Sequence, residues 1–492
     1  MALKLQHSKL PAGKLLIGGR FVDGRSETKI DLVYPGTGEG IASFAGASAQ
    51  DVDAAVQIAR QALQQGPWTT KISPAERSRI LWRLSELMLE NVNELAELES
   101  VDTGKPINET TAIEIPLSAE IFQYFAGWTT KITGDTIPSR QGMLNFTLRE
   151  PVGVVGVITP WNFPLLMSTW KIAAALACGN VVIHKPSELT PLTALRMGEL
   201  ALEAGLPEGV LQVLPGTGPE AGEAMVQHRG IDKISFTGST AVGQRIMRES
   251  AGSLKRLTLE LGGKSPNVVF ADADMEAAVR GAVNAIFYNK GEVCSAGSRL
   301  LIERSIKDEF LEKVIARAEK LTAAQGDPLS TKTRLGPQVS QVQMEKVLGY
   351  IAKGQEEGAK LIYGGGRNEA AGSGFFVKPT IFDGVSNEMT IAREEIFGPV
   401  VATIAFDSVE EAAVLGNTND FGLAAGVWTR DVKKALRAAK ALRTGTVWVN
   451  TFNMFDAAMP FGGFKSSGFG RELGAQAIEN YTELKTVWVD LS

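Results

Sequence analysis

Cys294 is one of only two cysteines in 492 residues, and it stands among small residues in the segment NKGEVCSAGSR, 289–299. A thiolate is a strong nucleophile, although a free thiol is only a few per cent ionised at neutral pH. The serine, alanine and glycine that follow Cys294 leave room for a substrate carbonyl, and Gly291 lets the backbone turn. Taken alone, the segment fits either a reactive thiol or a buried structural cysteine, which is our expectation for Cys178.

Two polar residues elsewhere in the chain could assist such a thiol. Glu260, in LELGGKSPN, ends an apolar run, and a carboxylate in an apolar setting has a raised pKa and can act as a general base. Asn162, in TPWNFP, is held in a loop between two prolines, where its amide could donate to a developing oxyanion. A salt-bridged or helix-capping role for Glu260 and a simple turn role for Asn162 also fit these patterns.

Two further segments have the chemistry of a dinucleotide site. In IHKPSE, Lys185 and Glu188 could hold ribose hydroxyls, and the carboxylate would repel a 2′-phosphate, which favours NAD over NADP. In SFTGSTAVG, Gly238 and Ser239 offer free N–H groups to a pyrophosphate at the start of a helix. The glycine spacing of SFTGSTAVG is not the usual dinucleotide fingerprint, and each segment is a weak signal by itself.

Composition excludes several classes of protein. The 55 acidic and 50 basic residues are well mixed, which argues against a nucleic-acid partner. Only three histidines occur, none near Cys294 in the sequence, so we predict neither a Cys–His pair nor a metal site. Two widely spaced cysteines indicate a reducing compartment, and we find neither a signal peptide in MALKLQHSKL nor a run of apolar residues that could span a membrane. We expect a globular, cytoplasmic protein without a membrane partner.

Apolar spacing predicts helices over 51–65 and 74–99, with Ser73 and Pro74 as the N-cap and first residue of the second. From residue 152 onward, short continuous apolar runs alternate with helical stretches, which is typical of an α/β fold with a parallel sheet covered on both faces. The expected strands are 152–158, 181–184, 210–214, 233–236, 257–261 and 267–270, with helices at 163–177, 190–204 and 239–251. A second α/β series has strand-like runs at 299–302, 400–406, 426–429 and 446–450.

Two segments fit neither series. Residues 132–150 and the tail 481–492 look like exposed β ribbons, and an exposed ribbon edge usually finds a partner strand. We therefore interpret them as an oligomerisation element.

In this order, PWNFP, KPSE, FTGSTAVG, LELGGKSPN, GEVCSAGSR, EEIFGPV and PFGGFKSSGFGRELG resemble the motif series of the NAD(P)-dependent aldehyde dehydrogenase superfamily. The resemblance runs from about residue 15 to 490. It implies an α/β fold with a Rossmann-like cofactor domain, an α/β catalytic domain and a small β oligomerisation element that builds a dimer or a homotetramer. The implied division is 1–131 and 151–261 for NAD binding, 262–465 for catalysis, and 132–150 with 478–492 for oligomerisation.

The same resemblance implies roles for single residues. Cys294 would be the nucleophile, Glu260 the base that activates a hydrolytic water, and Asn162, with the backbone N–H of Cys294, the oxyanion site. Glu395 would hold the nicotinamide ribose, with Phe397 packed near the nicotinamide. The other implied cofactor contacts are Trp161, Lys185, Glu188, Gly218, Pro219, Gly238, Ser239, Val242, Leu261, Gln343 and Lys346.

The implied activity is oxidation of an aldehyde to the carboxylic acid with NAD, through a cysteine thiohemiacetal and thioester. Positions that resemble the family's substrate tunnel are Phe163, Leu166, Trp170, Val293, Asn453, Phe455, Met459 and Phe461. Their aromatic and aliphatic character, without a basic residue, predicts a neutral, apolar aldehyde, either aromatic or medium-chain aliphatic. Many relatives carry a polar or second sulfur residue where this chain has Val293. A cysteine hydrolase that needs no dinucleotide and a non-catalytic relative of the family are the alternatives.

Overall fold

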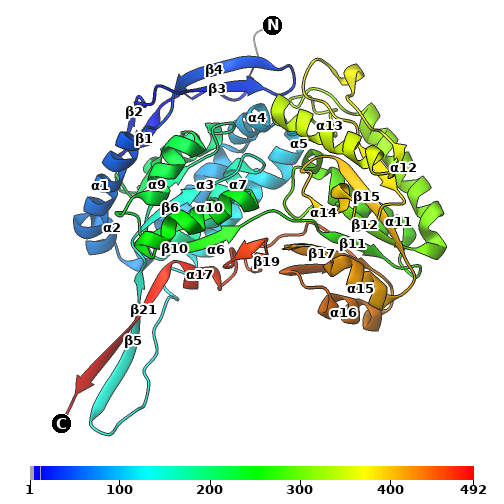
Figure 1. Cartoon of the computed structure of the whole chain (residues 1–492). Helices are drawn as coiled ribbons and strands as arrows, with labels where there is room; N and C mark the ends of the chain where they lie inside the picture. The colour runs from blue at the N-terminus through cyan, green and yellow to red at the C-terminus, as the bar shows by residue number, and fades with distance from the viewer. Residues whose placement is uncertain (1–4, 12) are drawn as a thin grey trace.

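The computed structural model describes residues 5–11 and 13–492, so the expected first segment, 1–131, begins outside the described residues. Two helix-covered sheets lie side by side, and a two-stranded ribbon projects away from the body on the side of one of them (Figure 1). The first sheet has eight strands and the second has seven. The predicted α/β class is confirmed.

The first sheet has the order β2-β1-β8-β7-β6-β9-β10-β20. Its strands are β1 (Leu15–Ile17), β2 (Arg20–Val22), β6 (Val154–Ile158), β7 (Val181–Lys185), β8 (Leu211–Val213), β9 (Lys233–Thr237), β10 (Arg256–Glu260) and β20 (Gly468–Phe469). The strands from β8 to β10 are parallel, and antiparallel strands add to both edges. The chain runs outward from β6 to β8 and then resumes on the other side at β9. The carboxyl ends of β6 and β9 therefore flank a crevice of the kind in which α/β sheets bind ligands.

Helices cover both faces of this sheet. They are α1 (Ala49–Gln65), α2 (Pro67–Thr70), α3 (Pro74–Glu90), α4 (Val92–Thr103), α5 (Ile107–Glu109), α6 (Ile115–Ala126), α7 (Pro164–Ala177), α8 (Leu192–Glu203), α9 (Glu223–Gln227) and α10 (Thr240–Ser250). Ser73 and Glu76 form a reciprocal capping box at the start of α3, as the Ser-Pro pair predicted. The prediction of one helix over 74–99 is wrong, because Asn91 ends α3 by donating its side-chain amide to the Leu87 carbonyl at 2.8 Å.

The second sheet has the order β13-β14-β15-β12-β11-β17-β18. Its strands are β11 (Pro266–Val269), β12 (Arg299–Glu303), β13 (Lys360–Tyr363), β14 (Thr380–Asp383), β15 (Val400–Phe406), β17 (Ala424–Trp428) and β18 (Thr446–Val449). All neighbours are parallel except β13 and β14. The helices beside it are α11 (Met275–Phe287), α12 (Lys307–Ala323), α13 (Gln341–Glu356), α14 (Thr390–Arg393), α15 (Val409–Asn417) and α16 (Val432–Ala441). The strands expected here all form, within two residues of the predicted bounds.

Smaller elements complete the chain. A hairpin of β3 (Lys29–Tyr34) and β4 (Glu39–Ala45) lies near the N-terminus, while β16 (Phe421–Gly422) pairs with β19 (Phe464–Lys465), and α17 (Ala477–Asn480) precedes the last strand. Over residues 5–11 and 13–492, none of the helices combines the length and apolarity that crossing a bilayer requires.

The projecting ribbon consists of β5 (Met143–Pro151) and β21 (Thr482–Asp490), which pair in antiparallel register over their full length (Figure 1). It joins the two segments that fitted neither α/β series. The prediction of a ribbon over all of 132–150 is only half correct, because no strand forms over 132–142, where a single bridge links Thr136 to Phe146. Leu484 and Trp488 of β21 are more than half exposed, so the ribbon presents apolar side chains that this chain does not cover.

Candidate active site

Cys294 lies in the loop between α11 and β12, where the small neighbours serve close backbone packing. Gly291 has φ +77°, and a Cβ atom there would lie 2.1 Å from the Gly398 carbonyl oxygen. A Cβ on Gly263 would lie 2.3 Å from the carbonyl oxygen of Cys294. Only glycine fits at these two positions, so the loop is fixed from both sides while the thiol itself stays half-buried.

Burial raises the pKa of the Cys294 thiol well above its usual range, and the negative charges of Glu260 and Glu395 raise it further. The resting residue is therefore a neutral thiol at neutral pH. Conversely, a positive charge beside the sulfur would lower the pKa of the thiol and favour the thiolate.

Glu260 is the last residue of β10, and its side chain is buried. Neither carboxylate oxygen has a hydrogen-bond partner among the described residues. Burial raises the pKa of Glu260 to about 8; the nearby Lys171 ammonium opposes this shift, while the charges of Glu472 and Glu395 add to it. A buried carboxyl with free oxygens and a pKa close to neutrality has the properties of a general base.

Asn162 follows β6 and is tied directly to the Cys294 loop. Its Nδ2 donates to the Glu292 carbonyl at 3.0 Å, while Asn289 Nδ2 donates to the carbonyls of Asn162, at 3.0 Å, and Glu292, at 3.1 Å. One hydrogen of the Asn162 amide thus remains available. The carboxyl end of β6 is therefore locked to the segment that carries the thiol.

Cys294, Glu260 and Asn162 line one cavity of about 210 Å³. Other residues in its lining are Trp161, Gly238, Ser239, Gln343, Lys346, Glu395 and Phe397. Cys294 also lines a second cavity, of about 490 Å³, on the side of α6 and α7. The thiol thus stands where two cavities meet, one lined mainly by polar and glycine residues of the crevice and the other mainly by apolar residues, aromatic and aliphatic.

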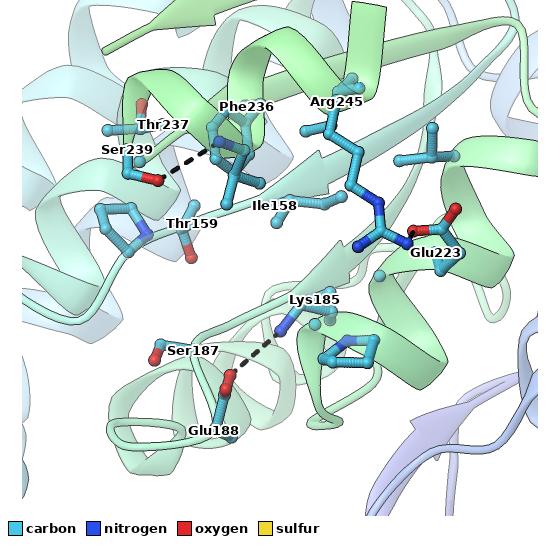
Figure 2. A pocket seen from close by; sticks show the side chains of 18 of the residues that line it. Ile158, Thr159, Lys185, Ser187, Glu188, Glu223, Phe236, Thr237, Ser239 and Arg245 are labelled. Carbon is cyan, nitrogen blue, oxygen red and sulfur yellow. Dashed lines mark hydrogen bonds and ion pairs between the residues drawn. The ribbon is translucent and has the colours of Figure 1, made fainter. Parts of the chain in front are cut away.

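A third cavity, of about 390 Å³, lies at the carboxyl ends of β6, β7 and β9 (Figure 2). Lys185 and Glu188 lie in its wall; the Lys185 Nζ donates to the carbonyls of Pro186, at 2.9 Å, and Gly216, at 2.8 Å, and lies 3.6 Å from the Glu188 carboxylate. Ser239 caps the N-terminus of α10, whose dipole favours an anion there. Trp161, Gly238 and Ser239 line both this cavity and the one that holds Glu260, so a single long ligand could occupy the two.

The sequence pattern of the aldehyde dehydrogenase family matches residues 21–487. The chain belongs to the aldehyde dehydrogenase family. DhaS of Bacillus subtilis is 52% identical over 478 residues, which are 97% of this chain and 96% of DhaS. An NAD⁺ complex of an aldehyde dehydrogenase from Bacillus cereus has a TM-score of 0.95 at 48% identity, over 97% of this chain and 96% of that one. The indole-3-acetaldehyde dehydrogenase AldA of P. syringae, solved with NAD⁺, has a TM-score of 0.95 at 45% identity, over 98% of this chain and 97% of that one.

In this aldehyde dehydrogenase, nearly all of the cofactor positions predicted from the sequence line one of the two crevice cavities. Gly218, Pro219 and Val242 lie with Lys185 and Glu188 in the wall of the larger one. Leu261 lines neither cavity, because its buried side chain packs under α10, where a Cβ on Gly243 would lie 2.6 Å from it.

Seven of the eight predicted tunnel residues line the 490 Å³ cavity of this aldehyde dehydrogenase: Phe163, Leu166, Trp170, Val293, Asn453, Phe455 and Phe461. Met459 does not, and it is 65% exposed. The turn closed by the Met459 N–H and the Asp456 carbonyl, at 3.0 Å, carries this side chain away from the cavity. The sequence order alone could not show that direction.

The structure also adds residues that sequence reasoning missed. Glu114, Leu117 and Glu120 line the same cavity from α6 and the turn before it, and Tyr288 stacks on Phe163 with ring centroids 6.1 Å apart. The buried Lys171, which ion-pairs with Glu472, is the cation near Glu260. These contacts join segments far apart in the chain, and no local motif marked them.

Proposed function

We propose that this aldehyde dehydrogenase uses NAD to oxidise a neutral, apolar aldehyde, aromatic or medium-chain aliphatic, to its carboxylic acid. The observation that carries the proposal is the position of Cys294, which lines both the aromatic cavity and the crevice cavity. A thiol in that place can reach an aldehyde on one side and a dinucleotide on the other. The NAD⁺ complexes among the similar structures support the same cofactor here.

The residues of the crevice fit NAD. Glu188 provides a carboxylate for ribose hydroxyls, and the N-terminus of α10 suits a pyrophosphate. The Glu395 carboxylate accepts a hydrogen bond from the Gly263 N–H at 2.9 Å, and a Cβ atom on Gly262 would lie only 2.4 Å from it. Glu395 is therefore held directly against the backbone of these two glycines. NAD, when bound, supplies the acceptor for the hydride that no side chain could take.

The chain's own groups account for the other steps. The Cys294 thiol first releases its proton to solvent, and the thiolate then adds to the aldehyde carbon. The oxyanion that forms receives hydrogen bonds from Asn162 Nδ2 and the Cys294 backbone N–H. After oxidation, Cys294 carries the substrate as a thioester. Glu260 removes a proton from the attacking water, and collapse of the second tetrahedral intermediate releases the carboxylic acid and the thiolate.

The lining of the 490 Å³ cavity supports a neutral substrate. Trp170, Phe455 and Phe461 form an aromatic cluster with ring centroids 5.3 to 5.7 Å apart. Within the described residues, no Lys, Arg or His lines this cavity, whereas Glu114 and Glu120 do. A carboxylate on the aldehyde would lose its hydration without gaining a counterion, which is costly. The P. syringae relative is named for an aromatic aldehyde, which agrees with this preference.

A panel of aldehydes tests this proposal. Phenylacetaldehyde, benzaldehyde and hexanal should be oxidised with higher kcat/KM than succinic semialdehyde, as measured by the absorbance of NADH. Cys294→Ala should abolish turnover, whereas the matched variant Cys178→Ala should remain active. A charged aldehyde as the best substrate would refute the substrate class, and full activity of Cys294→Ala would refute the mechanism.

We extend the proposal to the assembly. Domains at 1–131 with 151–261, at 262–465, and an oligomerisation element at 132–150 with 478–492 agree with the two sheets and the projecting ribbon. The exposed Leu484 and Trp488 suit burial against a second copy of the chain, as a dimer or homotetramer. The scarcity of cysteine supports a cytoplasmic location.

A further inference from the structure

The far end of the crevice has not been assigned to any one part of NAD. Beyond Lys185 and Glu188, the 390 Å³ cavity continues as a slot between two helical segments. Its apolar walls come from Pro219 and Val226 on the side of α9, and from Val242 and Ile246 on α10. The apolar character of these walls suits a largely apolar ring.

An ion pair stands at the edge of this slot. Arg245 extends from α10 toward α9, and its Nη2 lies 2.9 Å from Glu223 Oε2 (Figure 2). Both residues line the cavity. The other Glu223 oxygen accepts from Gln227 Nε2 at 2.8 Å, so the carboxylate is held from two sides and keeps lone pairs free.

The inference rests on the proposed function, because that function decides which part of NAD reaches this ion pair. If Lys185 and Glu188 hold the adenosine ribose and Ser239 lies at the pyrophosphate, the base is the part of NAD left for the slot. Adenine has an amine donor next to a ring-nitrogen acceptor on one edge. A carboxylate beside a guanidinium presents the complementary acceptor and donor.

We propose that the Glu223–Arg245 ion pair recognises the edge of the adenine ring and gives the site its preference for that base. Glu223 accepts a hydrogen bond from the exocyclic amine, and Arg245 donates to a ring nitrogen. In hypoxanthine an oxygen replaces the amine, so the carboxylate would face another acceptor, and the base would be disfavoured.

The exposure of the ion pair to water limits how strongly the site can discriminate between the two bases. The Arg245 side chain is 57% exposed and that of Glu223 is 22% exposed, so water competes for both groups. We expect NAD to bind about fivefold more tightly than nicotinamide hypoxanthine dinucleotide, well below the discrimination of a fully buried site.

Calorimetric titration of the full-length protein with each dinucleotide tests the inference. In Glu223→Gln the preference for NAD should fall below about twofold, because an amide can both donate and accept. Arg245→Gln should weaken NAD binding by about threefold. Glu90→Gln is the matched control, since Glu90 on α3 pairs with the exposed Arg83 at 2.7 Å but lines none of the three cavities. It should keep the wild-type preference.

The outcomes separate the inference from the proposed function. Equal binding of the two dinucleotides to the wild type, or an equal loss of preference in Glu90→Gln, would overturn the role of the pair while leaving NAD as cofactor. No binding of either dinucleotide would overturn both. If the pair merely tied α9 to α10, Glu223→Gln would lower the melting temperature of the ligand-free protein and leave the wild-type preference between the bases.

Discussion

Replacing Glu260 with glutamine should separate the two halves of the reaction. The variant keeps the shape of the side chain but cannot take a proton from water. General-base catalysis is worth about 10²- to 10⁴-fold, so steady-state turnover should fall by at least about 100-fold. Formation of the thioester does not use this base, so a burst of NADH close to one equivalent per active site should remain.

The pKa of Glu260 adds a second, quantitative signature. With a pKa of about 8, the ionised fraction rises from about 0.1 at pH 7 to about 0.9 at pH 9. A base works in its deprotonated form, so the rate of thioester hydrolysis in the wild type should increase about tenfold over this interval. In Glu260→Gln this increase should be lost.

Stopped-flow measurement of NADH with phenylacetaldehyde, from pH 7 to pH 9, reports the burst and the steady state together. Loss of the burst in proportion to turnover would refute the hydrolytic role, since Glu260 would then act before the thioester forms. An unchanged, about tenfold increase in the variant would assign the pH dependence to another group.

Other changes test other parts of the site. Asn162→Ala should lower kcat/KM by about 100-fold, with the fold checked by circular dichroism because the same amide bonds the Glu292 carbonyl; near-normal kinetics would remove Asn162 from the oxyanion site. Glu188→Gln should improve NADP binding relative to NAD by about tenfold in calorimetry, since the repulsion of a 2′-phosphate is removed, and an unchanged ratio would contradict this role. Trp488→Asp should reduce the assembly to smaller species in analytical ultracentrifugation, whereas an unchanged mass would exclude the exposed face of β21 from the interface.

The central strands could be predicted from the sequence because both faces of each are buried. In β6, β7 and β9 every residue is buried, and the apolar runs VVGVI of β6 and VVI of β7 can be recognised without tertiary information, whereas β9, KISFT, alternates polar and apolar residues. The short strands β1 and β2 escaped prediction, because three residues at the edge of a sheet carry too little pattern.

The candidate site could be predicted only in part. Cys294, Glu260 and Asn162 stand in distinctive local motifs, and the structure brings all three to one cavity. The charge near Glu260 depends on Lys171 and Glu472, which are 301 positions apart, and no spacing rule links such residues. Met459 is the opposite case: its place in a motif predicted a tunnel position, but its side chain is exposed and is not part of the cavity lining.

The most direct test of the whole account is mass spectrometry of Glu260→Gln after mixing with NAD and phenylacetaldehyde. A base-deficient variant should accumulate the thioester, so peptide mapping should find a phenylacetyl group on Cys294 and none on Cys178. The adduct should require NAD, because oxidation precedes it. An unmodified Cys294 under conditions that yield NADH, or an acyl group on another residue, would contradict the assignment of Cys294 as the nucleophile.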